Sequence, residues 1–383
     1  MKFLFRIFAI FSFTVLGIHA RTWISADGKS TFEGELIKYN ANTGEVTVDR
    51  SGKRVTFMQQ VLSESDIDFL KNWKPSATPV TAGARQAQPV AKHGLLKIAG
   101  GKLCSASGQP VQLKGMSLFW SQWAGNWYTA ATVESLANQW GCTIVRAAMG
   151  VESGGYLTQP DTEKAKVKTV VDAAIAQGIY VIIDWHDHNA EKHPQQAIGF
   201  FTEMATTYKN VPNVMFEIYN EPVKTPWPVI KNYAENVIKA IRSTGAQNVI
   251  IVGTPKWSQD VNIAADDPIK GSNIAYTLHF YAGSHKQGLR DKASYAMNKG
   301  LALVVTEWGA CDASGNGGFN EAESEKWMQF LNANKISWAN WSLFDKEETA
   351  SAVQPSSSPK GPWGKDDLTP SGLFVTRQFP MSK

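Results

Sequence analysis

Eight apolar, β-branched runs that alternate with amphipathic stretches constrain the fold of this chain more than any other feature. The runs occupy residues 111–119, 142–149, 180–186, 213–220, 248–254, 274–281, 301–309 and 336–344. Near-continuous apolar runs are typical of parallel strands that are buried on both faces. The stretches between them show helical spacing, as in Ala197, Phe200, Phe201, Met204, Ala205 and Tyr208, and in Val167, Val170, Val171, Ala174 and Ile175 before Gly178.

Eight such strands with crossover helices predict an α/β fold, a (β/α)8 TIM barrel, over residues 95–383. An open doubly wound sheet is the alternative. It is disfavoured because no glycine-rich phosphate-binding turn follows the first strand.

The residues before the barrel fall into three parts. Residues 1–20, MKFLFRIFAIFSFTVLGIHA, combine a basic start with a short apolar run and predict a signal peptide cleaved after Ala20. Residues 21–74 contain short β-rich runs separated by DGK, NTG and SGK, which predict a small all-β barrel or meander with one short helix. Residues 75–94, rich in Pro, Ala and Thr, predict a linker.

Composition narrows the classes of partner. The 383 residues carry a net charge of +4 without a dense basic block, so nucleic-acid binding is not expected. After the signal peptide no stretch is long and apolar enough to span a bilayer, and we expect a secreted protein without a membrane contact. The three cysteines match no zinc pattern. Only Cys104 and Cys142 could form a disulfide, because both precede strands at the bottom of the barrel while Cys311 follows one at the top.

Polar and aromatic side chains gather where the predicted strands end, which in a TIM barrel is where the active site is built. In strand order they are Trp120 and Trp123, Arg146, His186 and His188, Asn220 and Glu221, Trp257, His279 and Tyr281, Glu307, and Trp341. A lone residue of this kind is often a hydrogen-bond partner or part of the core. Two glutamates, three histidines, an arginine and several tryptophans at one rim indicate a site instead.

The two carboxylates at this rim, Glu221 and Glu307, point to glycoside hydrolysis. That reaction needs one carboxyl to protonate the leaving oxygen and another to stay ionised. A metal site of His186, His188 and Glu221 is an alternative, but its ligand spacing is loose and the tryptophans suit sugar faces better. We predict no metal and no cofactor.

Several segments resemble glycoside hydrolase family 5, most closely its bacterial endo-1,4-β-glucanase (cellulase) subfamily. They are IVRAAM, VIIDWH, IYNEP, GTPKWSQDV, TLHFYAG, TEWG, WANWSL and SGLFV, and the resemblance runs from about Leu95 to Phe379. It implies a retaining double displacement on internal β-1,4-glucosidic bonds of cellulose and related β-glucans. Glu221 would be the acid/base and Glu307 the nucleophile.

The resemblance also implies roles for the surrounding residues. Arg146 and Tyr281 would hydrogen-bond Glu307 and keep it ionised, while Glu221 would be protonated. The sugar at subsite −1 would meet Asn220, His186, His279 and Trp341. The glycone side would involve Trp123, Lys346 and Glu348, and the aglycone side Trp257.

Two departures from the family pattern leave the glycone contacts open. Many relatives have His where this chain has Phe119, and some have Tyr where it has Gly150. A β-mannanase or a mixed-linkage glucanase on the same barrel is therefore an alternative. A non-catalytic carbohydrate-binding protein is another, although it would not need a matched acid and nucleophile.

The β-rich unit of residues 21–74 bears a weaker resemblance to the Src-homology-3-like Sla homology domain, through RTW and DGK. Relatives of that domain bind peptides. In an exported protein a peptide, the cell wall or a polysaccharide are all candidate partners of this unit.

Overall fold

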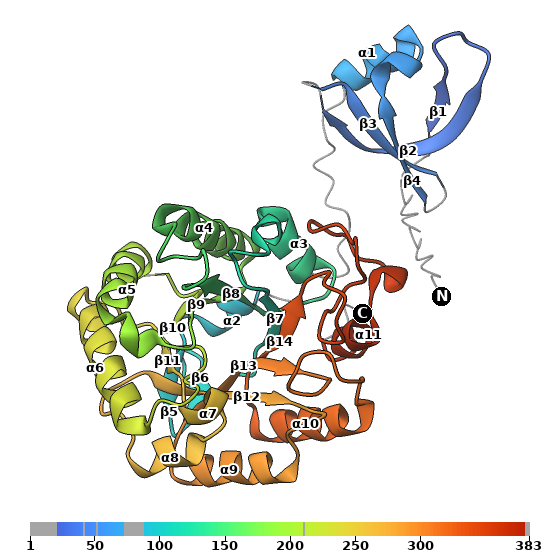
Figure 1. Ribbon diagram of the computed structural model, residues 1–383. Coiled ribbons are helices and arrows are strands. Elements are labelled where there is room, and N and C mark those ends of the chain that lie inside the picture. The colour runs from blue at the N-terminus through green and yellow to red at the C-terminus, as the bar shows by residue number, and fades with distance from the viewer. Residues whose placement is uncertain (1–20, 41–42, 51–52, 73–87, 210, 380–383) are drawn as a thin grey trace, which may run out of the picture. The chain divides into compact units, whose positions relative to one another are not determined.

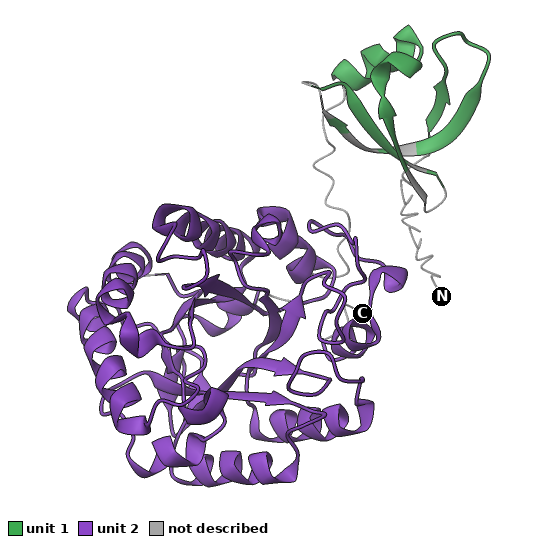
Figure 2. Cartoon of the chain, in the orientation of Figure 1, with its two compact units in different colours: residues 1–81 green, residues 82–383 purple. Residues whose placement is uncertain are grey.

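The computed structural model describes residues 21–40, 43–50, 53–72, 88–209 and 211–379. The predicted signal peptide, residues 1–20, and most of the predicted linker lie outside these ranges. The chain divides into two compact units, residues 1–81 and 82–383 (Figure 2).

The first unit is an antiparallel meander with one α-helix, as the hairpin signals predict. Its strands β1 (Arg21–Ile24), β2 (Thr31–Asn40), β3 (Glu45–Arg50) and β4 (Lys53–Met58) pair in sequence order, and η1 (Gln59–Val61) and α1 (Glu64–Asn72) follow. Trp23 is fully buried among Val46, Val48 and Leu70. The likeness to the Src-homology-3-like domain stays a prediction.

The second unit is a closed barrel of eight parallel strands, which confirms the predicted TIM barrel (Figure 1). Its strands are β7 (Lys114–Leu118), β8 (Ile144–Gly150), β9 (Tyr180–His186), β10 (Val214–Glu217), β11 (Ile250–Val252), β12 (Ile274–Tyr281), β13 (Leu303–Gly309) and β14 (Trp338–Leu343). Figure 1 shows the strands at the centre and the helices around them. Six of the eight strands are shorter or shifted relative to the apolar runs, and β10 ends at Glu217, so Asn220 and Glu221 lie in the loop beyond it.

The surrounding helices bury one face each against the barrel. They are α3 (Ala130–Asn138), α4 (Pro160–Gln177), α5 (Pro194–Tyr208), α6 (Trp227–Ser243), α7 (Pro255–Ser258), α8 (Val261–Asp266), α9 (Gln287–Asn298), α10 (Glu321–Asn334) and α11 (Pro370–Thr376), with short 3-10 turns at η2 (Gly125–Trp127), η3 (Ala190–Lys192) and η4 (Lys365–Asp367). All six apolar residues predicted for the stripe on α5 are buried. On α4 the prediction was wrong for Ile175, which is 37% exposed, and Gly178 caps the helix in the left-handed conformation.

The amino-terminal end of the barrel is closed by segments that the periodicity did not reveal. The hairpin of β5 (Lys97–Ala99) and β6 (Lys102–Cys104) contributes to an apolar cluster with Leu96, Ile144, Tyr180 and Ile182. Helix α2 (Pro89–His93) lies just before it, and the amide of Val90 donates to the carbonyl of Gly178. Residues 88–94 therefore differ from the predicted linker and contact the barrel.

The three cysteines are buried free thiols. Cys104 and Cys142 are thus not joined, and the one disulfide that the sequence left open is absent from the described residues.

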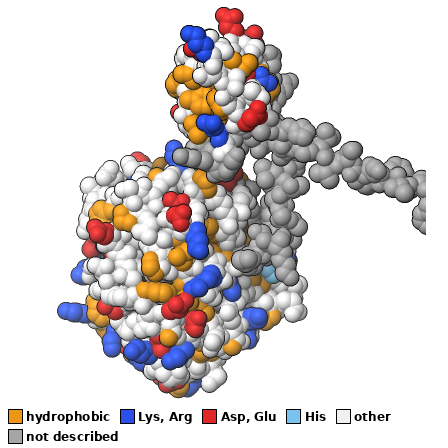
Figure 3. Space-filling model, turned by 90° about the vertical axis from the view of Figure 1, so that its right-hand side faces the viewer, with side chains coloured by type: hydrophobic (Ala, Val, Ile, Leu, Met, Phe, Trp, Pro, Cys, Tyr) orange, Lys and Arg blue, Asp and Glu red, His pale blue; other side chains and the backbone are white. Residues whose placement is uncertain are grey.

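The charges are mixed on the face of the protein shown in Figure 3. Lysine and arginine side chains alternate with aspartate and glutamate there, without a continuous patch of either sign among the described residues. Within the ranges that the structure covers, no helix combines the length and the apolarity needed to cross a bilayer.

Candidate active site

Every second side chain of a barrel strand points inward, and on β9 and β10 the inward side chains change from apolar to polar along the strand. On β9 the inward series is Ile182, Asp184 and His186, and on β10 it is Met215 and Glu217. The apolar members fill the lower half of the barrel. The polar members, all buried, form a layer beneath the carboxyl ends of the strands.

Arg146 is the centre of this polar layer. Its Nε donates to Glu217 at 2.7 Å, its Nη2 lies 2.9 Å from Asp184 and 2.6 Å from Asn220 Oδ1, and its Nη1 lies 3.2 Å from Glu307. The guanidinium is fully buried, and burial lowers its pKa. Asp184, Glu217 and Glu307 outweigh this and raise the pKa of Arg146, so it is a permanent cation in the floor of the site.

Glu307 stands above this cation. The Tyr281 hydroxyl donates to Glu307 Oε1 at 2.8 Å, and Arg146 donates to Oε2. The predicted partners of Glu307 are therefore the observed ones. Only 5% of Glu307 is exposed, which keeps its carboxylate out of bulk water.

Glu221 is held by two imidazoles. His279 Nδ1 lies 2.8 Å from Glu221 Oε1, and His188 Nε2 lies 3.3 Å from Oε2. A hydrogen-bond chain continues inward, from His279 Nε2 to the Thr306 hydroxyl at 2.8 Å and from that hydroxyl to Glu217 at 2.6 Å. Glu221 and Arg146 are thus joined through Glu217.

Glu221 and Glu307 face each other closely. One carboxylate oxygen of each, together with a nitrogen of His279, all lie within 4.8 Å of one another. Inverting glycosidases need about 6.5–9.5 Å between carboxyls to admit a water, whereas retaining enzymes use about 5–5.5 Å. This upper limit on the distance between one oxygen of each carboxylate is consistent with the shorter, retaining spacing.

The pKa shifts of this pair oppose the direction predicted from the sequence. Burial raises the pKa of Glu221, but hydrogen bonds from His188 and His279 outweigh it and bring that pKa to about 2. Burial and the charge of Glu221 raise the pKa of Glu307, against smaller lowering contributions from His279, Arg146 and Tyr281. Without substrate, Glu221 is therefore the more acidic carboxyl. The low pKa of Glu221 depends on the contact with His188, which local sequence patterns do not predict.

His186 lies under the aromatic side chains of the rim. Its ring stacks on Trp341 with centroids 5.2 Å apart, and its Nδ1 lies 2.6 Å from Asp184. Burial, followed by the charge of Arg146, brings the pKa of His186 well below its usual range, so the imidazole is neutral. Asn220 and Trp341 are also buried, and Asn220 Oδ1 accepts a hydrogen bond from Arg146 Nη2.

The remaining predicted residues lie on two different sides of the rim. Phe119 contacts Trp341, Trp123 and, through its ring face, the Lys346 ammonium, which also pairs with Glu348. Trp257 lies apart from them. It lines a cavity of about 670 Å³ together with Glu221, Glu307, His279 and Tyr281. Both Trp123 and Trp257 are largely exposed, at 57% and 42%.

Trp257 is presented by an unusual turn. The segment α7 is not a regular helix, because Lys256, Trp257 and Ser258 have φ values of 58°, 54° and 55°. Two bonds tie this left-handed turn to the segment that carries Glu221. The Trp257 amide donates to the Pro222 carbonyl at 2.9 Å, and the buried Ser258 hydroxyl donates to the Asn220 carbonyl at 2.8 Å.

Two sets of described side chains lie close enough to share a metal ion. They are Glu221, His279 and Glu307, and Glu152, Asp187 and His193. The set considered from the sequence, His186, His188 and Glu221, is not among them. In both sets the side chains already hydrogen-bond one another or their neighbours.

Sequence reasoning missed four residues of this network: Asp184, Glu217, Thr306 and, as a partner of Glu221, His188. A signal for the first two was present, since each lies two positions from an inward residue of the same strand. The contact of His188 with Glu221 depends on loop geometry and has no such signal.

Comparison with known proteins agrees with this geometry. Residues 104–347, well over half of the chain, match the cellulase family, glycosyl hydrolase family 5. The chain belongs to glycosyl hydrolase family 5. An endoglucanase of Clostridium saccharobutylicum is 50% identical over 291 residues, covering 75% of this chain and 65% of that protein. Endoglucanase Z of Dickeya dadantii is 56% identical over 266 residues, covering 68% and 61%. This chain thus spans less than two thirds of the length of these relatives.

Solved structures of the family superimpose on the barrel unit. A structure from Cytophaga hutchinsonii has 55% identity and a TM-score of 0.75, covering 76% of this chain and 95% of that one. The catalytic domain of Thermobifida fusca endoglucanase Cel5A, in complex with cellotetraose, has 32% identity and a TM-score of 0.73, covering 76% and 99%.

Proposed function

We propose that this protein hydrolyses internal β-1,4-glucosidic bonds of cellulose and related β-glucans with retention of anomeric configuration. The observation that carries this proposal is the close, buried pair of Glu221 and Glu307, one bonded to imidazoles and the other to a tyrosine and an arginine. The endoglucanase names of the relatives and the cellotetraose bound to the Thermobifida enzyme support the choice of a β-glucan.

In the first step Glu307 is the nucleophile. Its carboxylate oxygen attacks the anomeric carbon as the glycosidic C–O bond breaks, and Glu221 gives a proton to the leaving oxygen. Glu221 must be protonated for this. Its proton comes from His279 or His188, the two ring nitrogens within hydrogen-bond distance of its carboxylate.

In the second step Glu221 acts as the base. It takes a proton from a water that attacks the anomeric carbon, and the ester bond to Glu307 breaks to return the carboxylate. Arg146 then stabilises the restored charge at 3.2 Å, and its own position is held by Asp184 and Glu217. The hydroxyl of Tyr281 contributes a second donor to the same carboxylate.

The sugar subsites are assigned as the family resemblance implies. Subsite −1 is formed by Asn220, His186, His279 and Trp341. The exposed face of Trp123, with the Lys346–Glu348 pair, serves the glycone side, and Trp257 serves the aglycone side. Exposed aromatic rings suit this role because the apolar faces of sugar rings stack on them.

The proposal is tested by the products and by the carboxylate variants. Viscosity of carboxymethylcellulose should fall faster than reducing ends appear, and the first product seen by NMR should be the β anomer. Glu307→Gln should lose nearly all turnover, while Glu221→Ala should be rescued in part by azide on an activated substrate. Near-normal activity of Glu307→Gln would refute the assignment.

Rates on glucan, mixed-linkage glucan, mannan and xylan distinguish the enzyme alternatives. A preference for mannan or for mixed-linkage glucan would leave the proposed mechanism unchanged but replace the proposed substrate. Binding of glucan without any release of reducing ends would instead indicate a carbohydrate-binding protein.

We further propose that the protein is exported and that residues 21–74 bind a peptide, the cell wall or a polysaccharide. The basic start and short apolar run of residues 1–20 support export. Amino-terminal sequencing of the protein from culture supernatant should begin at Arg21. Pull-down of the isolated first unit on cellulose, cell-wall sacculi and a peptide library would identify its partner.

A further inference from the structure

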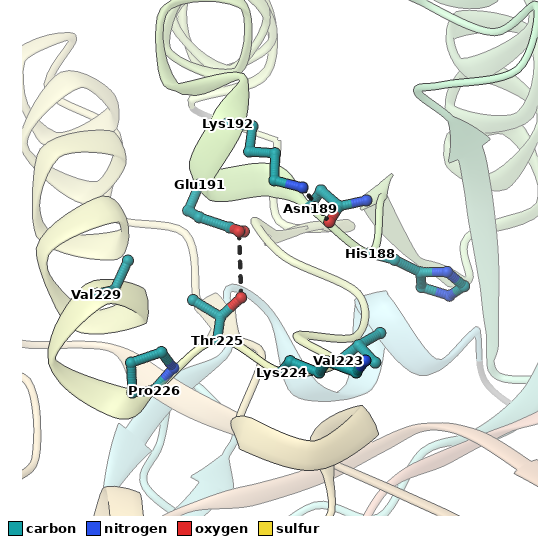
Figure 4. A pocket seen from close by; sticks show the side chains of 9 residues that line it. All are labelled: His188, Asn189, Glu191, Lys192, Val223, Lys224, Thr225, Pro226 and Val229. Atoms are coloured by element: carbon teal, nitrogen blue, oxygen red, sulfur yellow. Dashed lines mark hydrogen bonds between the residues drawn. The ribbon is translucent and has the colours of Figure 1, made fainter.

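A second cavity opens beside the cavity that contains Glu221 and Glu307. This side cavity, of about 640 Å³, lies between residues 188–192, which follow β9 and include η3, and residues 223–229, which run from the loop after β10 into the first turn of α6 (Figure 4). His188 lines both cavities and contacts Glu221 at 3.3 Å. A group in the side cavity is therefore one side chain away from Glu221.

The one carboxylate among the described residues that line the side cavity, Glu191, is hydrogen-bonded by neutral donors. Glu191 accepts a hydrogen bond from the Tyr219 hydroxyl at one oxygen. At the other oxygen it accepts one from the Thr225 hydroxyl at 3.2 Å (Figure 4). Both of these partners are uncharged. Neither of these hydrogen bonds involves a lysine of the cavity.

The cations of the side cavity are Lys192 and Lys224, and both are exposed. The Lys192 ammonium donates to Asn189 Oδ1 at 3.0 Å, an uncharged partner. Among the residues that the structure describes, neither lysine lies within 4.0 Å of a carboxylate oxygen. Two ammonium groups against one carboxylate leave the lining with a net positive charge, before any contribution from His188.

A net positive cavity beside a reaction centre selects for negatively charged ligands. Building on the proposed function, we propose that the side cavity binds a carboxylate-bearing sugar side chain of the glucan, on the leaving-group side of the bond that is cleaved. The main chain of the glucan would pass through the larger cavity over Trp257. The side chain would leave it past His188, with its carboxylate between Lys192 and Lys224.

Two soluble cellulose ethers provide the test, because carboxymethylcellulose carries carboxylates and hydroxyethylcellulose, at equal substitution, does not. In the double variant Lys192→Gln/Lys224→Gln, kcat/KM on carboxymethylcellulose should fall about three- to ten-fold, the effect of losing two exposed charge pairs. On hydroxyethylcellulose it should change less than about two-fold. Sodium chloride at about 0.5 M should remove most of the difference in kcat/KM on carboxymethylcellulose between wild type and the variant, because salt screens exposed charges.

The matched control is Lys239→Gln/Lys270→Gln. It removes the same charge from two exposed lysines, one on α6 and one in the segment that leads into the amino-terminal end of β12. In the control variant, the ratio of kcat/KM on carboxymethylcellulose to kcat/KM on hydroxyethylcellulose should be the same as in wild type. Equal losses on both ethers in the Lys192/Lys224 variant, or no loss on either, would overturn the proposed side-chain site. Inactivity of the wild type on both ethers would instead refute the proposed function.

Discussion

Replacing Ser258 by alanine should impair protonation of the leaving group although Ser258 itself lies outside the pair of carboxylates. The hydroxyl of Ser258 is fully buried, donates to the Asn220 carbonyl at 2.8 Å and accepts from the Thr254 amide at 3.3 Å. Asn220 precedes Glu221, so this hydroxyl anchors the segment that carries the proposed acid.

The magnitude follows from the bonds lost and from the turn that they restrain. A buried carbonyl without a partner costs about 1–3 kcal/mol. Each of the three left-handed residues, Lys256, Trp257 and Ser258, costs about 1–3 kcal/mol in backbone strain. Without the hydroxyl, the bond from the Trp257 amide to the Pro222 carbonyl is the one hydrogen bond among the described residues that still ties the turn to this segment. A shift of about 1 Å at Glu221 would then cost about 100-fold in rate.

The assay compares two leaving groups. On cellulose oligomers, whose leaving group needs a proton, kcat/KM for Ser258→Ala should fall about 10- to 100-fold. On an aryl cellobioside with a dinitrophenolate leaving group, which departs without a proton, kcat/KM should fall less than about three-fold, because kcat/KM excludes the second step in which Glu221 acts as base. A purely structural defect would lower both rates alike.

Two further variants separate strain from the hydrogen bond. Ser258→Gly adopts the positive φ without strain, so it should be more stable than the alanine variant by about 1 kcal/mol, yet show the same selective loss of rate. Ser243→Ala removes an exposed hydroxyl at the end of α6 that bonds only to Ala240, and it should behave as wild type. Normal turnover of cellulose oligomers by both Ser258 variants would refute the reasoning.

Three other predictions concern the polar layer, the two carboxyls and the start of the barrel unit. Glu217→Gln weakens a buried hydrogen bond to Arg146 while Asp184 and Glu307 still balance the guanidinium, so it should cost about 1–3 kcal/mol and lower the Tm by about 2–5 °C in calorimetry. The raised pKa of Glu307 destabilises the fold at pH 7, so Glu307→Gln should have a higher Tm than wild type there, and the gap should close as the pH falls below the normal glutamate range. Glu221, with its pKa lowered to about 2, stabilises the fold at pH values above the normal pKa of a glutamate. Glu221→Gln should therefore have a lower Tm than wild type at pH 7 and approach the wild-type Tm toward pH 2. Tm changes of the same sign at pH 7 in the Glu307 and Glu221 variants would contradict these pKa shifts. A chain starting at Ala82 should keep full activity on soluble glucan, whereas one starting at Gly94 loses α2 and its bond to Gly178 and should melt at a lower temperature than the longer chain.

Local patterns were sufficient for the architecture and for the position of the main pair. The eight apolar runs predicted a parallel barrel, and the strands found in them confirm it. Glu221 and Glu307 could be singled out because a carboxyl that follows a buried strand of a barrel must emerge at the common rim. The hydrogen bonds of Arg146 and Tyr281 to Glu307, which the family resemblance implied, are likewise observed.

The tertiary structure alone decided which side chains contact one another. The sequence of this protein determined that the rim would hold two glutamates, because strand period and strand ends are local properties. It did not determine that His188 would reach Glu221, that Glu217 would join Arg146 to Thr306, or that the loops after β9 and β10 would enclose a positive cavity. Nor did it reveal that residues 88–94 contact the barrel. These contacts depend on barrel register and on loop paths, which bring together residues far apart in the chain. The protonation of Glu221 and Glu307 follows from those contacts, because a buried carboxyl takes its pKa from the groups within hydrogen-bond distance.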